Sequence, residues 1–327
     1  MLLAGDVGGT KTTIALFKET EDGLREVREG TFLSRDHESL EEILAKFLPM
    51  GAGRLFSTGC FGVAGPVIDG KSRTTNLPWQ LDEQILAKTI GIRRVKLLND
   101  LEATAYGTLH LQSADFCVLS QGLGSKEQGN IGVIAAGTGL GEAMLVWDGS
   151  RHKLVASEGG HGDFAPRSDL EIQLLVYLTR KYRGHVSYER VLSGSGLFEV
   201  YTFLRQVSDT AEPRWLKEAV TRSDPSVAVT EAGLAAKDEI CVQALEIFAS
   251  IYGAEAGNLA LKCVALGGVL VGGGIAQKIL PVLEAGSFMS SFVDKGRYRT
   301  MMQRMPVKVV LNQRAALFGA AHYALRL

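Results

Sequence analysis

Apolar positions in the first hundred residues follow a strand-like pattern in some stretches and a helical period in others. Apolar-rich stretches near 2–6 and 12–17 predict the two strands of a hairpin. Over 40–48 the apolar residues fall on one face of a helix. Ser39 is the expected N-cap of this helix, and Glu42 completes a capping box with it.

The same alternation continues through the first third of the chain. A strand at 61–64 precedes a helix that begins after Asp82 and ends at Gly91. A short strand at 95–98 then leads into a helix over 101–111. Strands that alternate with helices predict an α/β sheet.

The remaining two thirds restart this pattern after a short crossing near 109–115. The predicted elements are strands near 115–119, 131–136 and 142–147, a helix that Ser168 and Glu171 open and that runs to Tyr182, a mostly helical region over 187–262, a strand at 266–271, a helix from Ile275, a strand at 307–311 and a final helix from Asn312. We therefore expect a small α/β domain of residues 1–110 plus 312–327 and a large α/β domain of residues 111–311.

Two glycine-dense turns between strands are candidate anion-binding sites. The first spans 5–10 (GDVGGT) and the second spans 137–141 (GTGLG). Glycine lets backbone N–H groups converge on an anion without a Cβ in the way. Either turn alone is explained as an ordinary tight hairpin, but the pair predicts two lobes that hold one polyphosphate. Asp6, at the end of its strand, is placed to hold a metal-bound water.

Neither turn matches the two best-known nucleotide loops. A P-loop needs G-x-x-x-x-G-K-[ST] leading into a helix, and here Thr10 separates Gly9 from Lys11. A dinucleotide fingerprint needs G-x-G-x-x-G at the start of a helix, whereas strand-like residues at 144–146 follow the second turn. We expect both turns to be the tips of β-hairpins.

Polar residues outside these turns are candidates for substrate binding. Asn99 and Asp100 lie where a strand ends and a helix begins, a common place for ligands, although either could simply cap the helix. Glu158 and His161 lie in a glycine-rich loop and offer the donors and acceptors that sugar hydroxyls need; a solvated turn is the alternative. Glu189 lies near a helix start, where the helix dipole alone favours an acid.

Composition narrows the classes of partner. The 327 residues carry 35 basic and 36 acidic side chains, a net charge of −1, and 46% are hydrophobic. This balance argues against nucleic acid or an anionic membrane as the main partner. The four cysteines form no C-x-x-C pair, so we expect no zinc site or disulfide framework and a cytoplasmic protein. The chain opens on a predicted strand, so we expect no signal peptide.

Taken together, these segments resemble the bacterial glucokinases of the hexokinase–actin–Hsp70 superfamily, nearly end to end. The segments that carry the resemblance are GDVGGT at 5–10, TNLPW at 75–79, LND at 98–100, GTGLG at 137–141, EGGHGDFAP at 158–166, SYERVLSG at 187–194 and GGGI at 272–275. The cysteine-rich zinc motif of the related repressor–ORF–kinase group has no counterpart here. Lys11 stands where the family often has Asn.

This resemblance implies a two-lobed actin-like ATPase fold of the ribonuclease H-like type, with a cleft between the lobes. It implies ATP-dependent phosphorylation of glucose at its 6-hydroxyl, a step of glycolysis, by a homodimer. Asp100 would be the base, and Asp6 would act on Mg²⁺ through water. The residues that would contact glucose are Asn76, Asn99, Asp100, Glu158, His161 and Glu189. The residues that would contact ATP are Asp6, Gly8, Gly9, Thr10, Lys11, Gly137, Thr138, Gly273 and Gly274.

Three other functions fit parts of the pattern. A kinase for mannose, fructose or N-acetylglucosamine would share most of these residues. A sugar-sensing regulator would bind glucose without turnover, but it would often carry a DNA-binding extension or lack the base, and Asp100 is present here. An actin-like filament protein would have no use for the pairing of Glu158 with His161.

Overall fold

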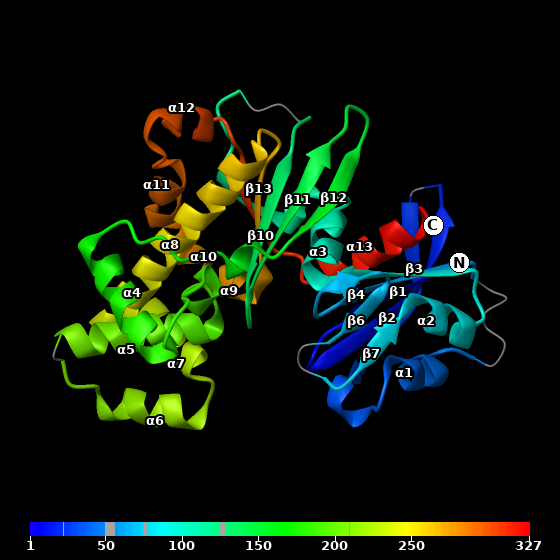
Figure 1. Cartoon of the computed structure of the whole chain (residues 1–327), viewed down its shortest axis with the longest axis horizontal. Helices are drawn as coiled ribbons and strands as arrows, with labels where there is room; N and C mark the ends of the chain where they lie inside the picture. The colour runs from blue at the N-terminus through cyan, green and yellow to red at the C-terminus, as the bar shows by residue number, and fades with distance from the viewer. Residues whose placement is uncertain (22, 50–55, 75–76, 125–127, 209) are drawn as a thin grey trace. The chain divides into compact units, whose positions relative to one another are not determined.

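A computed structural model describes residues 1–21, 23–49, 56–74, 77–124, 128–208 and 210–327. These residues form two compact units, which Figure 1 colours along the chain. The N-terminal unit comprises Met1–Asp115 together with Asn312–Leu327, and the central unit comprises Phe116–Leu311. Each unit is α/β, with its own sheet, helices and apolar core.

The N-terminal unit is built on a five-stranded sheet of order β3-β2-β1-β4-β8. The strands are β1 Leu2–Val7, β2 Lys11–Thr20, β3 Gly23–Leu33, β4 Thr58–Val63 and β8 Arg94–Asn99. β2 is antiparallel to both β1 and β3, whereas β1, β4 and β8 are parallel neighbours. A second sheet has three short strands, β5 Val67–Ile68, β6 Lys71–Arg73 and β7 Gln80–Asp82.

In the described part of this unit the α-helices are α1 Leu40–Phe47, α2 Glu83–Ile90, α3 Asp100–Thr108 and α13 Ala315–Ala324. α3 and α13 approach closely because glycines face each other's backbone. A Cβ on Gly107 would lie 1.9 Å from the Ala315 oxygen, and one on Gly319 would lie 1.8 Å from the Ala103 oxygen. Any larger residue at either glycine would force the two helices apart.

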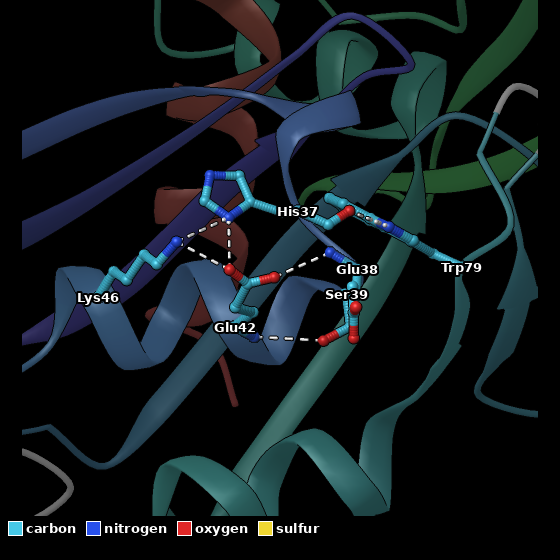
Figure 2. A network of polar contacts seen from close by, with 6 residues as sticks. All are labelled: His37, Glu38, Ser39, Glu42, Lys46 and Trp79. Atoms are coloured by element: carbon cyan, nitrogen blue, oxygen red, sulfur yellow. Dashed lines mark hydrogen bonds and ion pairs between the residues drawn. The ribbon is translucent and has the colours of Figure 1, made fainter.

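The start of α1 shows how a local cap connects to more distant residues (Figure 2). Ser39 Oγ accepts from the backbone N–H of Glu42 at 3.2 Å, as predicted for the N-cap. The Glu42 carboxylate accepts from the backbone of Glu38 at 2.8 Å, instead of closing the expected capping box on Ser39. Trp79, which is buried in the core of this unit, donates from its indole to the His37 oxygen at 3.2 Å.

The central unit is built on a six-stranded sheet of order β12-β11-β10-β13-β14-β9. The strands are β9 Phe116–Ser120, β10 Ile131–Ala136, β11 Leu140–Trp147, β12 His152–Ser157, β13 Gly268–Gly272 and β14 Val307–Val310. β10 is antiparallel to β11 and parallel to β13, so the hairpin β10–β11 and the start of the segment after β13 lie at one edge of the sheet.

Helices make up most of the rest of the central unit. They are α4 Asp169–Tyr182, α5 Gly194–Ser208, α6 Arg214–Arg222, α7 Pro225–Leu234, α8 Glu239–Cys263, α9 Gly273–Lys278, α10 Leu280–Glu284, α11 Ser287–Val293 and α12 Arg299–Met302, with short 3-10 turns between some of them. The 25-residue α8 contributes many of the buried side chains of this core. None of the helices in the described ranges is long and apolar enough to cross a membrane.

Most of the predicted elements are confirmed, and the differences have physical causes. The helix predicted between Asp82 and Gly91 begins and ends there, because Asp82 accepts from two backbone N–H groups and Gly91 adopts φ 78°. The helix predicted over 101–111 ends earlier, at Thr108. Strands β3 and β12 were not predicted, because their exposed residues lack a regular apolar alternation.

Candidate active site

The predicted acidic residues of the N-terminal unit gather at one edge of its sheet. Asp6 on β1 lies in register with Gly62 on β4, and Asn99 ends the next parallel strand, β8. Asp100 follows as the first residue of α3. Gly62 lets the first turn of α3 pack closely against β4, since a Cβ there would lie 2.8 Å from the Ala103 Cβ. The parallel sheet thus brings Asp6, Asn99 and Asp100 together.

The structure distinguishes Asn99 from Asp100, either of which could have capped the helix according to the sequence. Asn99 is the N-cap of α3, and its Oδ1 accepts from the Leu101 N–H at 2.9 Å. Its backbone N–H donates to Glu102 Oε2 at 2.7 Å, and its amide donates to the Gly65 oxygen at 3.1 Å. Asp100 is exposed, and its Oδ1 also accepts from the Leu101 N–H, at 2.8 Å. The cap is therefore Asn99, and the Asp100 carboxylate is accessible for chemistry.

The electrostatics of Asp6 suit a divalent cation. Burial, and secondarily the neighbouring negative charge of Asp100, raise the pKa of Asp6 to about 6. A cation beside these two carboxyls would offset both effects. Within the described ranges no three His, Cys, Asp or Glu side chains gather into a metal cage. Mg²⁺ fits this donor set, because it usually keeps several waters and uses one or two carboxylates together with phosphate oxygens.

The first glycine turn is a hairpin tip, as predicted. It lies between β1 and β2 and is closed by a bond from the Gly8 N–H to the Lys11 oxygen at 3.0 Å. Thr10 and Lys11 are exposed, and Gly9 is half-buried. Ser34, a fully buried residue that no sequence motif marked, donates from Oγ to the Gly8 oxygen at 2.7 Å and from N–H to the Thr10 oxygen at 3.0 Å. The turn is therefore held from behind while its tip stays accessible.

The second glycine turn joins β10 to β11 and is also a hairpin tip. Thr138 is exposed at this tip. The Gly137 oxygen accepts from the Gly194 N–H at 2.9 Å, and the Leu140 N–H donates to Glu189 Oε2 at 3.1 Å. The segment around Glu189 thus supports the turn directly.

The segment 273–274 lies beside the second turn. β10 and β13 end side by side at Ala136 and Gly272. Gly273 has φ +85°, and a Cβ on it would lie 2.2 Å from the Ala136 oxygen, so a larger residue would not fit. The Tyr252 hydroxyl accepts from the Ala136 N–H at 3.0 Å and donates to the Gly272 oxygen at 3.2 Å. Sequence reasoning missed Tyr252, because nothing local distinguishes it from other buried aromatics of α8.

The three sugar-site candidates of the central unit converge. His161 Nε2 lies 3.9 Å from Glu158 Oε2, and His161 Nδ1 lies 4.0 Å from Glu189 Oε1. The two segments that carry them are joined by a bond from the Tyr188 N–H to the Gly162 oxygen at 2.9 Å. The Glu158 and His161 side chains are more than half exposed. We call Glu158, His161 and Glu189 the histidine–glutamate cluster.

Glu189 connects this cluster to the second glycine turn. One of its carboxylate oxygens faces His161, and the other accepts from the Leu140 backbone. The cluster offers carboxylate acceptors and an imidazole that can donate or accept, which is the chemistry that binds hydroxyl groups. The remaining candidate, Asn76, lies outside the described residues.

Comparison with known proteins gives a consistent result. A family model described as Glucokinase matches residues 3–327. A relative from Synechocystis, described as a glucokinase, is 44% identical over 342 residues, which cover 98% of this chain and 96% of that relative. The crystal structure of a glucokinase from an Antarctic psychrotroph matches with a TM-score of 0.86 and 29% identity, over 100% of this chain and 99% of that one.

A more distant structure supports the fold alone. A repressor–ORF–kinase family glucokinase from Streptomyces griseus, solved in complex with glucose and AMPPNP, matches with a TM-score of 0.64 and 21% identity, over 100% of this chain and 99% of that one. The actin-like ATPase fold expected from the sequence is thereby confirmed.

Proposed function

The chain belongs to the glucokinase family, and from that membership we propose that it transfers the γ-phosphoryl group of ATP to the 6-hydroxyl of glucose, giving glucose 6-phosphate. The observation that carries this proposal is the histidine–glutamate cluster. His161 lies between two carboxylates, and one of these, Glu189, also bonds the backbone of a glycine turn. In this proposal the cluster binds sugar hydroxyls, and Glu189 joins it to a turn that can bind phosphate.

In this proposal Asp100 accepts the proton of the 6-hydroxyl as that oxygen attacks the γ-phosphorus, and the bond from this phosphorus to the β,γ-bridging oxygen breaks as ADP leaves. Phosphoryl transfer leaves the protein mainly the tasks of positioning and charge stabilisation. The exposed Asp100, directly after β8, is suited to positioning the attacking hydroxyl. Glucose hydroxyls bind to the histidine–glutamate cluster and to Asn99 and Asn76.

The phosphates of ATP bind to the two hairpin tips. The exposed tip residues Thr10, Lys11 and Thr138, together with the flanking glycines Gly8, Gly9 and Gly137, support this assignment, and Gly273 and Gly274 are assigned to the adenosine. Asp6 would hold Mg²⁺ through water, and the cation would supply positive charge against the phosphates. We also propose a cytoplasmic homodimer, and light scattering of the purified protein tests the dimer.

Gly137→Val is expected to weaken ATP binding selectively. A Cβ on Gly137 would meet no atom within 4 Å, and its φ is not in the left-handed region, so the hairpin itself tolerates the substitution. The added side chain occupies the space through which phosphate must approach the backbone. We expect the KM for ATP to rise by roughly tenfold or more, the cost of losing one charge-assisted hydrogen bond of about 1.5–3 kcal/mol, while the KM for glucose stays nearly constant.

Gly139→Ala provides the contrast for this experiment. A Cβ at Gly139 would lie 2.4 Å from Glu189 Oε2 and must displace that carboxylate. We expect this variant to raise the KM for glucose as well. Unchanged ATP kinetics in a folded Gly137→Val protein would remove the second turn from the phosphate site.

Asp6→Asn is expected to raise the Mg²⁺ concentration needed for half-maximal rate. The substitution removes the negative charge but keeps the size of the side chain. We expect a shift of roughly 10- to 100-fold, the usual cost of removing a partner in the outer shell of a metal. Initial rates over a Mg²⁺ titration at fixed ATP measure it, and excess EDTA should abolish the activity of the parent. An unshifted Mg²⁺ titration would exclude Asp6 from the metal site.

The experiment that tests the function is a coupled assay for glucose 6-phosphate with ATP, with and without Mg²⁺. We expect turnover that requires both glucose and Mg²⁺. The same assay with mannose, fructose and N-acetylglucosamine separates a glucokinase from a kinase for another hexose. Saturable glucose binding without turnover would indicate the sugar-sensing alternative instead.

A further inference from the structure

A buried carboxyl with no donor lies directly behind the histidine–glutamate cluster. Glu142, on β11, is 2% exposed. No hydrogen-bond donor in the described part of the chain reaches either of its carboxyl oxygens. Burying a charged carboxylate without a donor is strongly unfavourable. Glu142 therefore needs either a proton or a partner.

The group that faces Glu142 is a second buried acid, Glu255 of α8, which is fully buried. Glu255 accepts from Asn258 Nδ2 at 2.7 Å and from Lys262 Nζ at 3.3 Å. An ionised carboxylate is only a hydrogen-bond acceptor, so two carboxylates cannot bond each other unless one of them carries a proton. A proton on Glu142 supplies the missing donor.

Other charged or titratable groups around this pair do not replace the proton. They are Lys262 and Tyr252 on α8, Cys263 at the end of α8, Tyr188 before Glu189, Lys295 after α11 and Arg167 before α4. Lys262 reaches Glu255, and Lys295 Nζ donates to the Ala254 oxygen and to Asn258 Oδ1, at 2.9 and 2.7 Å. The cations therefore lie on the Glu255 side of the pair.

Both acids touch the segments that carry the cluster. A Cβ on Gly159, the residue after Glu158, would lie 2.1 Å from Glu142 Oε2, so this carboxyl packs against the backbone of the Glu158–His161 loop. On the other side, the Asn258 amide that binds Glu255 also donates to the Tyr188 hydroxyl at 3.1 Å. Tyr188 immediately precedes Glu189.

We propose that Glu142 is a positioning residue for the sugar site, and that it acts by donating a carboxyl proton to Glu255. The proposal rests on the glucokinase function proposed above. When the proton is lost, two negative charges face each other in the core. The sheet pairs β11 on both sides, with β10 and β12, so the strand resists movement. The glycine-rich loop of Glu158 and His161 yields instead, and glucose binding weakens.

The direction of the pH effect follows from the same contacts. Burial, and secondarily Glu255, raise the pKa of Glu142 from 4.5 to about 8. The folded protein then holds this proton more tightly than the unfolded chain. Its contribution to stability is complete below about pH 4.5 and is lost as the pH rises through about 8. The same change should appear in glucose affinity on the alkaline side of neutrality.

Glu142→Gln tests the proposal, because the amide keeps the shape and a donor but cannot ionise. The KM for glucose is measured at saturating ATP from about pH 6.5 to about pH 9, for this variant and for the parent. A single proton changes affinity by at most about tenfold per pH unit, and we expect the glucose KM of the parent to rise by roughly three- to tenfold between about pH 7 and about pH 9. The Glu142→Gln value should stay within about twofold. Parallel profiles for the two proteins would overturn the proposal.

Glu199→Gln is the matched control. Glu199 is also a buried acid of the central unit, but Lys181 donates to both of its oxygens at 2.7 Å. Its substitution should leave the pH profile of the parent unchanged, and a flattened profile in this control would overturn the assignment to Glu142.

Thermal unfolding against pH, without substrates, provides a readout independent of activity. The midpoint of the parent should fall relative to Glu142→Gln as the pH rises from about 4.5 to about 8, and the difference should level off above that; equal pH dependence would overturn the proposal. If Glu142→Gln does not fold, Glu255→Gln serves as the second variant, because it removes the facing charge. It should flatten the pH profiles of both the glucose KM and the unfolding midpoint. A pH dependence like that of the parent would overturn the proposal. If the parent protein phosphorylates no glucose at any pH, the proposed function is refuted instead. The unfolding comparison would still test whether Glu142 carries a proton.

Discussion

Asp100→Asn is expected to lower kcat by roughly two to four decades, the usual contribution of a general base. The amide has the size of the carboxylate but cannot take the proton of the attacking hydroxyl. The start of α3 should survive, because Asn99 caps the helix and the remaining oxygen of an amide at position 100 can still accept from the Leu101 N–H. The KM for glucose should change only a few-fold. Steady-state rates and a thermal melt measure both points.

Glu102→Gln is the control for this prediction. Glu102 lies in the same first turn of α3 and accepts from the Asn99 N–H at 2.7 Å, a bond that a glutamine oxygen can keep. Its substitution removes the same amount of charge from the same helix terminus but leaves the proposed base in place. The kcat should therefore stay within a few-fold of the parent. An Asp100→Asn protein with a kcat in that range would remove Asp100 from the mechanism.

His161→Ala and Glu158→Ala are each expected to weaken glucose binding while ATP binding stays nearly constant. Each truncation leaves bound sugar hydroxyls without a partner, at a cost of about 1–3 kcal/mol. This corresponds to a rise of roughly 5- to 150-fold in the KM for glucose. Both side chains are more than half exposed, so the fold should be unaffected. The KM values for glucose and ATP, measured separately, give the result.

His185→Ala is matched to His161→Ala. The His185 side chain has the same exposed fraction, 58%, and it also faces an acid of this segment, Asp163, at 2.9 Å. Because it is not part of the histidine–glutamate cluster, its truncation should leave both KM values near those of the parent. Equal losses in the two histidine variants, or equal effects on glucose and ATP, would show that the cluster does not read the sugar.

Sequence patterns were sufficient where the stabilising contacts are local. The N-caps Ser39, Asp82 and Ser168 each accept from a backbone N–H within three residues, so the side chain and its partner are read from one short stretch. The two glycine turns were located for the same reason, since a hairpin tip is defined by adjacent residues. Spacing alone could not assign roles to individual site residues. Those roles came from matching whole motifs.

Contacts that depend on the direction of the incoming chain or on strand pairing escaped the sequence patterns, even between residues close in the sequence. The long strand β3 is mostly exposed and exists because β2 pairs with it. The acids of the two expected capping boxes accept from the residue before the N-cap, Glu38 or Arg167, a choice that depends on how the incoming chain is directed.

The sequence by itself determined the α/β class, several helix ends and the glycine turns, because each depends on neighbours within a few positions, and it supplied the candidate polar residues of the site. Only the tertiary structure showed that the Tyr252 hydroxyl bonds the residues before two glycine segments, and that Glu142 is buried against Glu255. Tyr252 lies 116 positions from Ala136 and 20 from Gly272, and Glu142 lies more than a hundred positions from Glu255. Their hydrogen bonds and charges act only once α8 packs against the sheet, and no local pattern records that packing.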